Sequence, residues 1–416
     1  MRNWNAALFA TTLLGASVVG SGCMGSIDDG VRGPRQTALE PPPGPVMRRL
    51  TTEQYRNTVA DLFGEGVAPS GELEPDSSLN GFLAIGTSRA TVSPHGAELY
   101  ETAAYEVADQ ALNSSARRDA LVSCTPVGTQ DAACARTFVT ELGRRAWRRP
   151  LEASEIETLT NIANRSAMVL GGFPERETGN PFYEGLEMAI AALLQSPNFL
   201  FRVEVGALIA AGQNGRDYTS LEMASRLSYA LWNSTPDEAL LAAGERGDLA
   251  TEEGVRREAE RLLASPRARG AVREFFSDML RLSSLSNLPQ NRSLFPQMSD
   301  TIGAAMREGT LRSLERQLLD EEAPYRSIFD SRTTFVNAEL ASLYGVPAPT
   351  SGQFAAVTLP ADGRRVGLLG EGSILAVTSH GHASSPTVRG RFIREALLCQ
   401  SIPAPPPSVG EPRALA

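Results

Sequence analysis

The segment TSLEMASRLSYALWNSTPDEALLAAGERGDLATEEGVRREAERLLASP, residues 219–266, decides the fold class. Thr219 and Glu222 have the spacing of a capping box, in which a threonine and an acid three residues later cap each other's backbone N–H groups. TPDE at 235–238 predicts a second helix start, because a hydroxyl cap, an early proline and two acids suit the positive end of a helix. With a further start at Thr251, the segment predicts helices in close succession.

Helix signals recur on both sides of this segment. Residues 51–64 begin with a capping box and end at a glycine, and residues 135–149 place apolar side chains on one stripe before a proline. Strand signals are few: residues 354–359 alternate weakly, and the run 366–379 favours a helix. We therefore predict a mainly α fold of multi-helix, orthogonal bundle-like modules with at most one or two short strands.

Composition limits the class of protein. The chain has 416 residues, enough for about two to four domains, and its 42% hydrophobic and 21% charged residues are typical of a globular protein. A formal net charge of −9 argues against nucleic acid as a partner, because nucleic acid needs a basic surface. With 3 histidines and 4 cysteines, the chain offers few soft ligands to a metal ion or a haem.

The N-terminus has the features of a secretory signal peptide. Arg2 supplies a weak positive charge, residues 6–22 (AALFATTLLGASVVGSG) are apolar or small, and Cys23 follows. A membrane-spanning helix needs about 20 apolar residues, and this run falls short of that length. We predict that residues 1–23 direct export, with a single-pass N-terminal anchor as the alternative.

Cys23 is the predicted lipidation site. GSG at 20–22 resembles the lipobox of bacterial lipoproteins, in which the cysteine becomes the acylated first residue, although that pattern usually has leucine where Gly20 stands. Acyl chains would hold a soluble body to a membrane, at about 0.8 kcal/mol for each buried methylene. Met24 is not aspartate, which favours the outer membrane by resemblance to the lipoprotein sorting pattern. Secretion after cleavage nearby is the alternative.

Between the leader and the body we expect a tether. PPPGP at 41–45 predicts an extended, semi-rigid linker over residues 24–46. The body is predicted to hold four helical modules and a short tail, at residues 47–112, 113–175, 176–290, 291–408 and 409–416.

Export would also explain the cysteines, because disulfides persist outside the cytoplasm. Cys124 and Cys134 lie ten positions apart in a predicted loop that leads into a helix, and we expect them to be bonded. Such a bond would add about 2–3 kcal/mol of stability by loop closure. If Cys23 is acylated, Cys399 is left without a partner.

Six segments of the body resemble one known family. They are MRRLTTEQYRNTVADLFG (47–64), FVTELGRRAWRRPLEASEIETL (138–159), FYEGLEMAIAALLQSPNFLFRVE (182–204), LEMASRLSYALWNSTPDEALLAAGERGDL (221–249), FDSRTTFVNAELASLYGV (329–346) and GLLGEGSILAVTSHGHASSPTVRGRFIREALLCQSIPAPPP (367–407). In this combination they resemble the planctomycete-type, cytochrome-C-associated envelope proteins built of PSD and PSCyt modules. The resemblance makes residues 291–408 a PSCyt-like module. It implies an exported bacterial protein and no specific function, because the modules are chiefly of unknown function.

The resemblance also bears on cofactors. Related chains continue past the proline run into a C-x-x-C-H haem-attachment motif, which this sequence does not contain before its end at Ala416. We therefore expect no cofactor in this chain, with haem c only on a missing segment or a partner. The expected partners are a membrane, held through the lipid anchor, and a c-type cytochrome or another envelope protein.

His380 and His382, in TSHGHASSP, are weak candidates for metal ligands. Two histidines two apart share a side of an extended segment, but zinc would need at least one more ligand. The alternative is a polar loop. Ser379, Ser384 and Ser385 raise the further alternative of a serine hydrolase, although no G-x-S-x-G elbow is present and the serines suit a cap before Pro386.

Arg144, Arg145, Arg148 and Arg149 are candidates for anion binding. They cluster at the predicted end of a helix, where cations also suit the helix dipole, so a purely structural role is the alternative. Arg389, Arg391 and Arg394 form a second, weaker basic patch.

The sequence contains no complete catalytic constellation. We predict an exported, lipid-anchored helical envelope protein that acts as a binding or scaffold component, and whether it is an enzyme stays open, with the balance against. The alternatives are the non-haem part of an electron-transfer system with a c-type cytochrome, and a metal-dependent or serine hydrolase that uses the His380 region.

Overall fold

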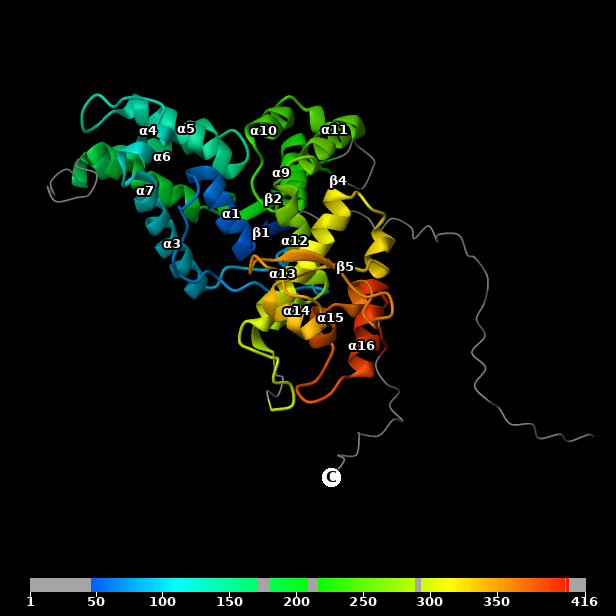
Figure 1. Cartoon of the computed structure of the whole chain (residues 1–416). Coiled ribbons are helices and arrows are strands. Elements are labelled where there is room, and N and C mark those ends of the chain that lie inside the picture. Colours follow the sequence, from blue (N-terminus) through cyan, green and yellow to red (C-terminus); the bar gives the residue numbers. More distant parts are fainter. Residues whose placement is uncertain (1–45, 171–179, 209–215, 289–292, 401, 404–416) are drawn as a thin grey trace, which may run out of the picture. The chain divides into compact units, whose positions relative to one another are not determined.

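The computed structural model describes residues 46–170, 180–208, 216–288, 293–400 and 402–403. Helices dominate this part of the chain, as Figure 1 shows, and the predicted mainly α fold is confirmed. Among the described residues, six short strands form three antiparallel pairs, where one or two strands were expected. Cys23, most of the tether and the tail at 409–416 lie outside the described residues.

The helices and strands have the following bounds. The helices are α1 Thr52–Phe63, α2 Leu83–Gly86, α3 Pro94–Leu112, α4 Ser115–Leu121, α5 Ala132–Trp147, α6 Ala153–Leu170, α7 Pro181–Gln195, α8 Pro197–Leu200, α9 Ser220–Leu231, α10 Glu238–Glu245, α11 Glu252–Leu263, α12 Ala268–Met279, α13 Ile302–Glu315, α14 Ala338–Tyr344, α15 Gly372–Val377 and α16 Pro386–Phe392. The strands are β1 Val46–Arg49, β2 Phe201–Glu204, β3 Ala207–Leu208, β4 Arg216–Asp217, β5 Thr333–Val336 and β6 Ala355–Thr358.

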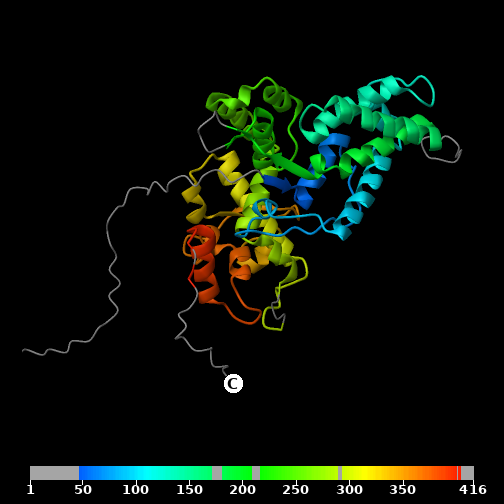
Figure 2. The same ribbon diagram turned by 180° about the vertical axis from the view of Figure 1, so that it is seen from behind.

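The first hydrophobic core draws on α1, α3, α5, α6 and α7. In α7, apolar side chains such as Leu186, Ile190 and Leu193 are fully buried, so α7 is the inner helix of this group. Both Figure 1 and Figure 2 show α6 beside α7. Gly185 permits this close approach, because a Cβ atom there would lie 2.2 Å from the carbonyl oxygen of Ala163.

Strand pairing joins the start of the described chain to the middle of the chain. β1 pairs antiparallel with β2, with Val46 opposite Glu204 and Arg49 opposite Phe201. The Glu204 carboxylate accepts from Arg48 over 3.0 Å and from Arg226 over 2.5 Å. This pair accounts for two of the strands beyond the one or two that were expected. Neither short segment alternates between apolar and polar residues strongly enough to predict a strand by itself.

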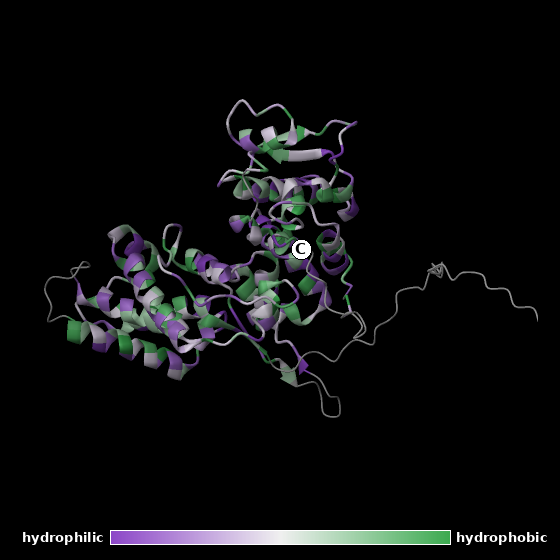
Figure 3. Ribbon diagram, turned by 90° about the horizontal axis from the view of Figure 1, so that it is seen from below, coloured by the Kyte–Doolittle hydropathy of each residue, from purple (hydrophilic) through white to green (hydrophobic). Residues whose placement is uncertain are grey.

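Two further cores lie toward the C-terminal side of the sequence. One gathers side chains of α9, α10, α11 and α12 around Trp232, and the other gathers α12 to α16 with β5. Hydrophobic and hydrophilic residues alternate along the helices in Figure 3, as expected of amphipathic elements. Among the helices that the structure describes, none is long and apolar enough to cross a membrane.

The helix-start patterns in the sequence predicted most helices correctly, and the predicted start of one helix differs from the observed one. Both capping boxes are present, Thr51 with Gln54 and Thr219 with Glu222. The helix expected from Thr235 instead has Asp237 as its N-cap, whose carboxylate accepts from the backbone of Leu240 over 2.9 Å. A carboxylate directly before the first helical residue is a stronger cap than a threonine hydroxyl, because its charge also suits the positive helix end.

Candidate functional site

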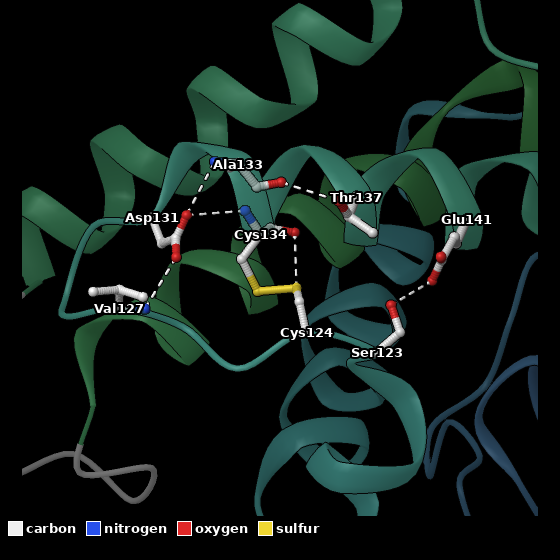
Figure 4. The surroundings of a disulfide bond; sticks show 8 residues. All are labelled: Ser123, Cys124, Val127, Asp131, Ala133, Cys134, Thr137 and Glu141. Carbon is white, nitrogen blue, oxygen red and sulfur yellow. Dashed lines mark hydrogen bonds between the residues drawn. A yellow bond between two sulfur atoms is a disulfide. The ribbon is translucent and has the colours of Figure 1, made fainter.

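The predicted disulfide is present at the start of α5. Cys124 and Cys134 are bonded, with their Cα atoms 5.7 Å apart (Figure 4). Asp131 caps the helix beside the bond and accepts from the backbone N–H groups of Ala133, Cys134 and Val127. These backbone hydrogen bonds lower the pKa of the Asp131 carboxyl. The bond and the cap together fix the loop that leads into α5.

Arg144 and Arg145, from the predicted anion-binding cluster, are used in contacts between helices. Arg144 forms ion pairs with Glu238 over 2.7 Å and with Glu245 over 2.6 Å, both in α10. Arg145 donates to the carbonyl oxygen of Asp61 over 2.8 Å. The two side chains therefore join α5 to α10 and to α1.

Arg148 is the most deeply buried member of the cluster. It ends α5 in the left-handed conformation, with φ 58°, and its guanidinium donates to the carbonyl oxygens of Asn198, Phe199 and Phe201 over 2.6, 3.1 and 2.8 Å. These carbonyl groups belong to α8 and the first residue of β2. A buried arginine needs such partners, because an unpaired buried charge is costly.

Arg149 pairs with Glu155 over 2.7 Å at the start of α6. A cavity of about 210 Å³ lies beside Arg148 and Arg149, yet both guanidinium groups already have protein partners. The four arginines of the cluster therefore contact different elements and do not converge on one anion. The geometry favours their structural role.

A larger cavity, which we call the His380 pocket, lies among α13, α14, α15 and α16. Its volume is about 350 Å³. Its lining residues are Phe295, Met298, Met306, Leu343, Arg365, Gly372, Leu375, Ala376, Ser379, His380, Ala383, Ser384 and Arg389. The pocket is mostly apolar, with one histidine and two arginines. Small-molecule sites in proteins commonly have this composition.

The segment with the two histidines forms a tight loop at the edge of this pocket. The backbone N–H of His380 donates to the carbonyl oxygen of Ala383 over 2.8 Å, and both His380 and His382 are exposed. Only His380 lines the pocket. Among the residues that the structure describes, no group of three or more His, Cys, Asp or Glu side chains could hold a metal ion. The geometry gives the metal hypothesis no support.

Of the three serines beside the histidines, Ser385 has the expected capping role. Ser385 is the N-cap of α16 and accepts from the backbone of Val388 over 3.3 Å. Ser379 and Ser384 pair as a short antiparallel bridge across the loop. Both also line the His380 pocket.

A buried acid lies next to the pocket. Glu371 accepts hydrogen bonds from the hydroxyl groups of Thr334 and Tyr344, each over 2.8 Å. Burial is the main cause that raises the pKa of Glu371, while the two hydroxyl donors and Arg365 act in the opposite direction. Arg365 stacks over the Tyr344 ring, with 4.5 Å between the guanidinium carbon and the ring centre.

Sequence reasoning missed Glu371, Tyr344 and Arg365 as members of a site. No local motif marks them, because they come together only through the packing of α14 against the loop before α15. The one available signal was the charge of Glu371 inside an otherwise apolar, glycine-rich run at 366–379.

Four family models match the chain, each described as a protein of unknown function. PSD3 (DUF1587) matches residues 48–113, PSD5 (DUF1595) matches 134–204, PSD4 (DUF1592) matches 218–346 and PSCyt3 (DUF1588) matches 365–415. The chain is a PSD/PSCyt module protein. The resemblance of its sequence segments to these modules is thereby confirmed. Comparison with curated proteins and with solved structures gives no match.

The His380 pocket of this PSD/PSCyt protein is shared between two modules. Met306 and Leu343 belong to the PSD4 match, and Arg365, Leu375 and Arg389 belong to the PSCyt3 match. The buried pair of Tyr344 and Glu371 crosses the same division. The pocket is therefore a feature of the modules in combination.

Proposed function

We propose that this PSD/PSCyt protein is exported to the bacterial cell envelope, is anchored by acylation of Cys23, and acts there as a binding or scaffold component. The observation that carries the proposal is the bond between Cys124 and Cys134. Disulfides persist in oxidising compartments and are rare in the cytosol. The apolar run before Cys23 supplies the matching export signal.

Binding is proposed in preference to catalysis because the buried charged groups are already hydrogen-bonded within the protein. The carboxylate of Glu371 is occupied by two hydroxyl groups, and Arg148 is occupied by backbone carbonyl groups. The His380 pocket offers apolar walls and cations to a ligand. An arrangement of this kind favours holding a molecule or a partner surface over transforming it.

Cell fractionation tests the anchor. The wild-type protein, produced in a bacterial host with its own leader, should sediment with membranes and be released by detergent. The Cys23→Ser variant should appear in the soluble envelope fraction or the medium. The Cys399→Ser variant is the matched control and should stay with the membranes. Wild-type protein in the cytosol, or a Cys23→Ser variant that remains in the membranes, would overturn the anchoring proposal.

A second candidate is a role beside a c-type cytochrome, as the non-haem part of an electron-transfer system. It is favoured by the match of residues 365–415 to the PSCyt3 model, whose name points to cytochrome association. Haem c and its axial ligand would then come from a partner. Purification from native envelopes should yield a co-eluting protein with Soret absorbance. An envelope complex without haem would exclude this candidate.

A further inference from the structure

The His380 pocket has the apolar walls of a ligand site. Its volume of about 350 Å³ falls in the range of roughly 300–1,000 Å³ that is usual for small-molecule sites. The apolar lining comes from Phe295, Met298, Met306, Leu343, Leu375 and Ala376. Two of these side chains are methionines, which adapt readily to the shape of an apolar ligand. The walls therefore suit a hydrocarbon or aromatic body.

Arg389 brings a positive charge to this apolar space. It lies half-buried in α16, and its Nε donates to the hydroxyl of Thr378 over 3.4 Å. Within the described parts of the chain, its guanidinium makes no ion pair, and its two terminal nitrogens have no hydrogen-bond acceptor. Their hydrogens remain available to a ligand. A guanidinium in such a position binds carboxylate or phosphate oxygens, often in pairs.

Arg365 supplies a second charge in a fixed position. Its Nη1 donates to the carbonyl oxygen of Gly370 over 2.9 Å, and its guanidinium stacks on Tyr344. The neighbouring acid Glu371 is buried and already accepts from two hydroxyl groups.

The balance of charges in the pocket indicates the chemistry of the occupant. Among the described residues that line the pocket, none is Asp or Glu. A neutral apolar molecule would cover two guanidinium groups without offering them an acceptor, which is costly. A bare inorganic anion would leave the apolar walls in water. Only a molecule with an apolar body and one anionic head satisfies both parts of the lining.

We propose that the His380 pocket binds a small amphiphilic anion, with its apolar body against Met306, Leu343 and Leu375 and its anionic head on Arg365 and Arg389. The ligand class is that of a medium-chain or aromatic carboxylate. The inference specifies the binding role proposed above and rests on that role, while it is independent of whether Cys23 is acylated.

Calorimetric titration with octanoate and with octan-1-ol tests the ligand class, since the two probes share an apolar chain and differ in charge. The full chain with Cys23→Ser is used, so that no acyl anchor competes for the pocket. Octanoate should bind at one site per chain, about tenfold or more tighter than octan-1-ol. Arg389→Gln should weaken octanoate binding by about tenfold and should not weaken the binding of octan-1-ol.

Three further variants separate a ligand contact from a general disturbance. Arg389→Lys keeps the charge and should recover part of the affinity for octanoate. Arg391→Gln lies in the same helix, where its side chain pairs with Glu395 at the surface, and should change neither affinity. Leu375→Trp fills the pocket and should weaken both probes. Thermal unfolding by circular dichroism should show that each variant is folded.

Each failure has its own meaning. Equal affinity for octanoate and octan-1-ol, unaffected by Arg389→Gln, would overturn the role of the arginines. The absence of octanoate binding would overturn the ligand class, whatever the result of the fractionation with Cys23→Ser. Octanoate binding by a protein that proves not to be acylated would overturn the anchor and leave the pocket proposal intact.

Discussion

The phenolic hydroxyl of Tyr344 donates to the Glu371 carboxylate over 2.8 Å, and the backbone N–H of Gly372 donates to the same phenolic oxygen over 2.7 Å. Tyr344 ends α14 and Glu371 precedes α15, so the pair joins the segments matched by PSD4 and PSCyt3. Burial is the first cause that raises the pKa of both groups. A buried polar pair of this kind makes the packing of the two segments specific.

Replacing Tyr344 by phenylalanine should destabilise the protein. The variant would leave a buried carboxylate oxygen of Glu371 and the N–H of Gly372 without partners, at a cost of about 1–3 kcal/mol. Urea unfolding followed by circular dichroism measures the change. Tyr105→Phe is the control, because Tyr105 is exposed in α3, and it should change stability by less than about 0.5 kcal/mol. Equal effects of the two variants would argue against the importance of the pair.

Glu274 in α12 should make stability depend on pH. Burial, followed by the charges of Asp278 and Glu53, raises its pKa to about 7. A carboxyl with a raised pKa in the folded state stabilises the fold fully below its unfolded pKa of about 4.3, and that contribution is lost as pH rises through 7. Glu274→Gln cannot ionise, so it should be more stable than the wild type at pH 8 by about 1–2 kcal/mol.

The urea midpoint of unfolding, measured at about pH 4 and at about pH 8, tests the effect of Glu274. These two pH values lie on either side of the range in which ionisation of the carboxyl should change stability. The advantage of Glu274→Gln at the higher pH should shrink at the lower one, where the wild-type carboxyl is protonated. Glu65→Gln, at an exposed position after α1, is the control for the loss of a surface carboxylate. A constant difference between Glu274→Gln and the wild type at both pH values would contradict the raised pKa.

Arg148→Ala should be strongly destabilising. The change removes the donor to three backbone carbonyl groups at α8 and β2, so we expect a loss of more than about 3 kcal/mol. Arg136→Ala in the same helix is the matched control, because Arg136 is exposed, and it should cost less than about 0.5 kcal/mol. A loss below about 1 kcal/mol for Arg148→Ala would show that the carbonyl groups find other partners.

Removing the disulfide should lower stability by a predictable amount. In the double variant Cys124→Ser, Cys134→Ser, the loss of a ten-residue loop constraint should cost about 2–3 kcal/mol. Cys399→Ser should leave the free energy of unfolding unchanged, because Cys399 is free and exposed. Addition of a reductant should destabilise the wild type and have no effect on the double variant. Wild-type protein that is indifferent to reductant would contradict the bond.

Features set by neighbouring residues could be predicted from the sequence. The capping boxes at Thr51 and Thr219, the N-cap at Ser385 and the bond between Cys124 and Cys134 all depend on spacings of a few residues. Hydrogen bonds from side chain to backbone over one helical turn form these caps, so the local sequence contains nearly all the information.

Features that depend on distant residues could not be predicted. The pairing of Val46 with Glu204 spans most of the N-terminal half of the body, and its short strands carry little pattern of their own. The roles of Arg148 and Arg149 diverge because one faces a group of carbonyls in α8 and the other a carboxylate in α6. A cluster of arginines in the sequence therefore does not predict the hydrogen-bond and ion-pair partners of each side chain in the folded chain.

The His380 pocket illustrates the same limit. The sequence singled out His380 for its chemistry, but the charged groups that face the cavity include Arg365 and Arg389, brought in by separate segments. Burial of Glu371 follows from packing against α14, which periodicity alone cannot reveal.

Intact-mass and peptide mass spectrometry of the mature protein, recovered from bacterial envelopes without reduction, tests the central claim most directly. The account predicts an N-terminus at Cys23 that carries acyl chains, a peptide cross-linked through Cys124 and Cys134, and a free thiol at Cys399. A protein that retains Met1, with an unmodified Cys23 and all four thiols reduced, would contradict it.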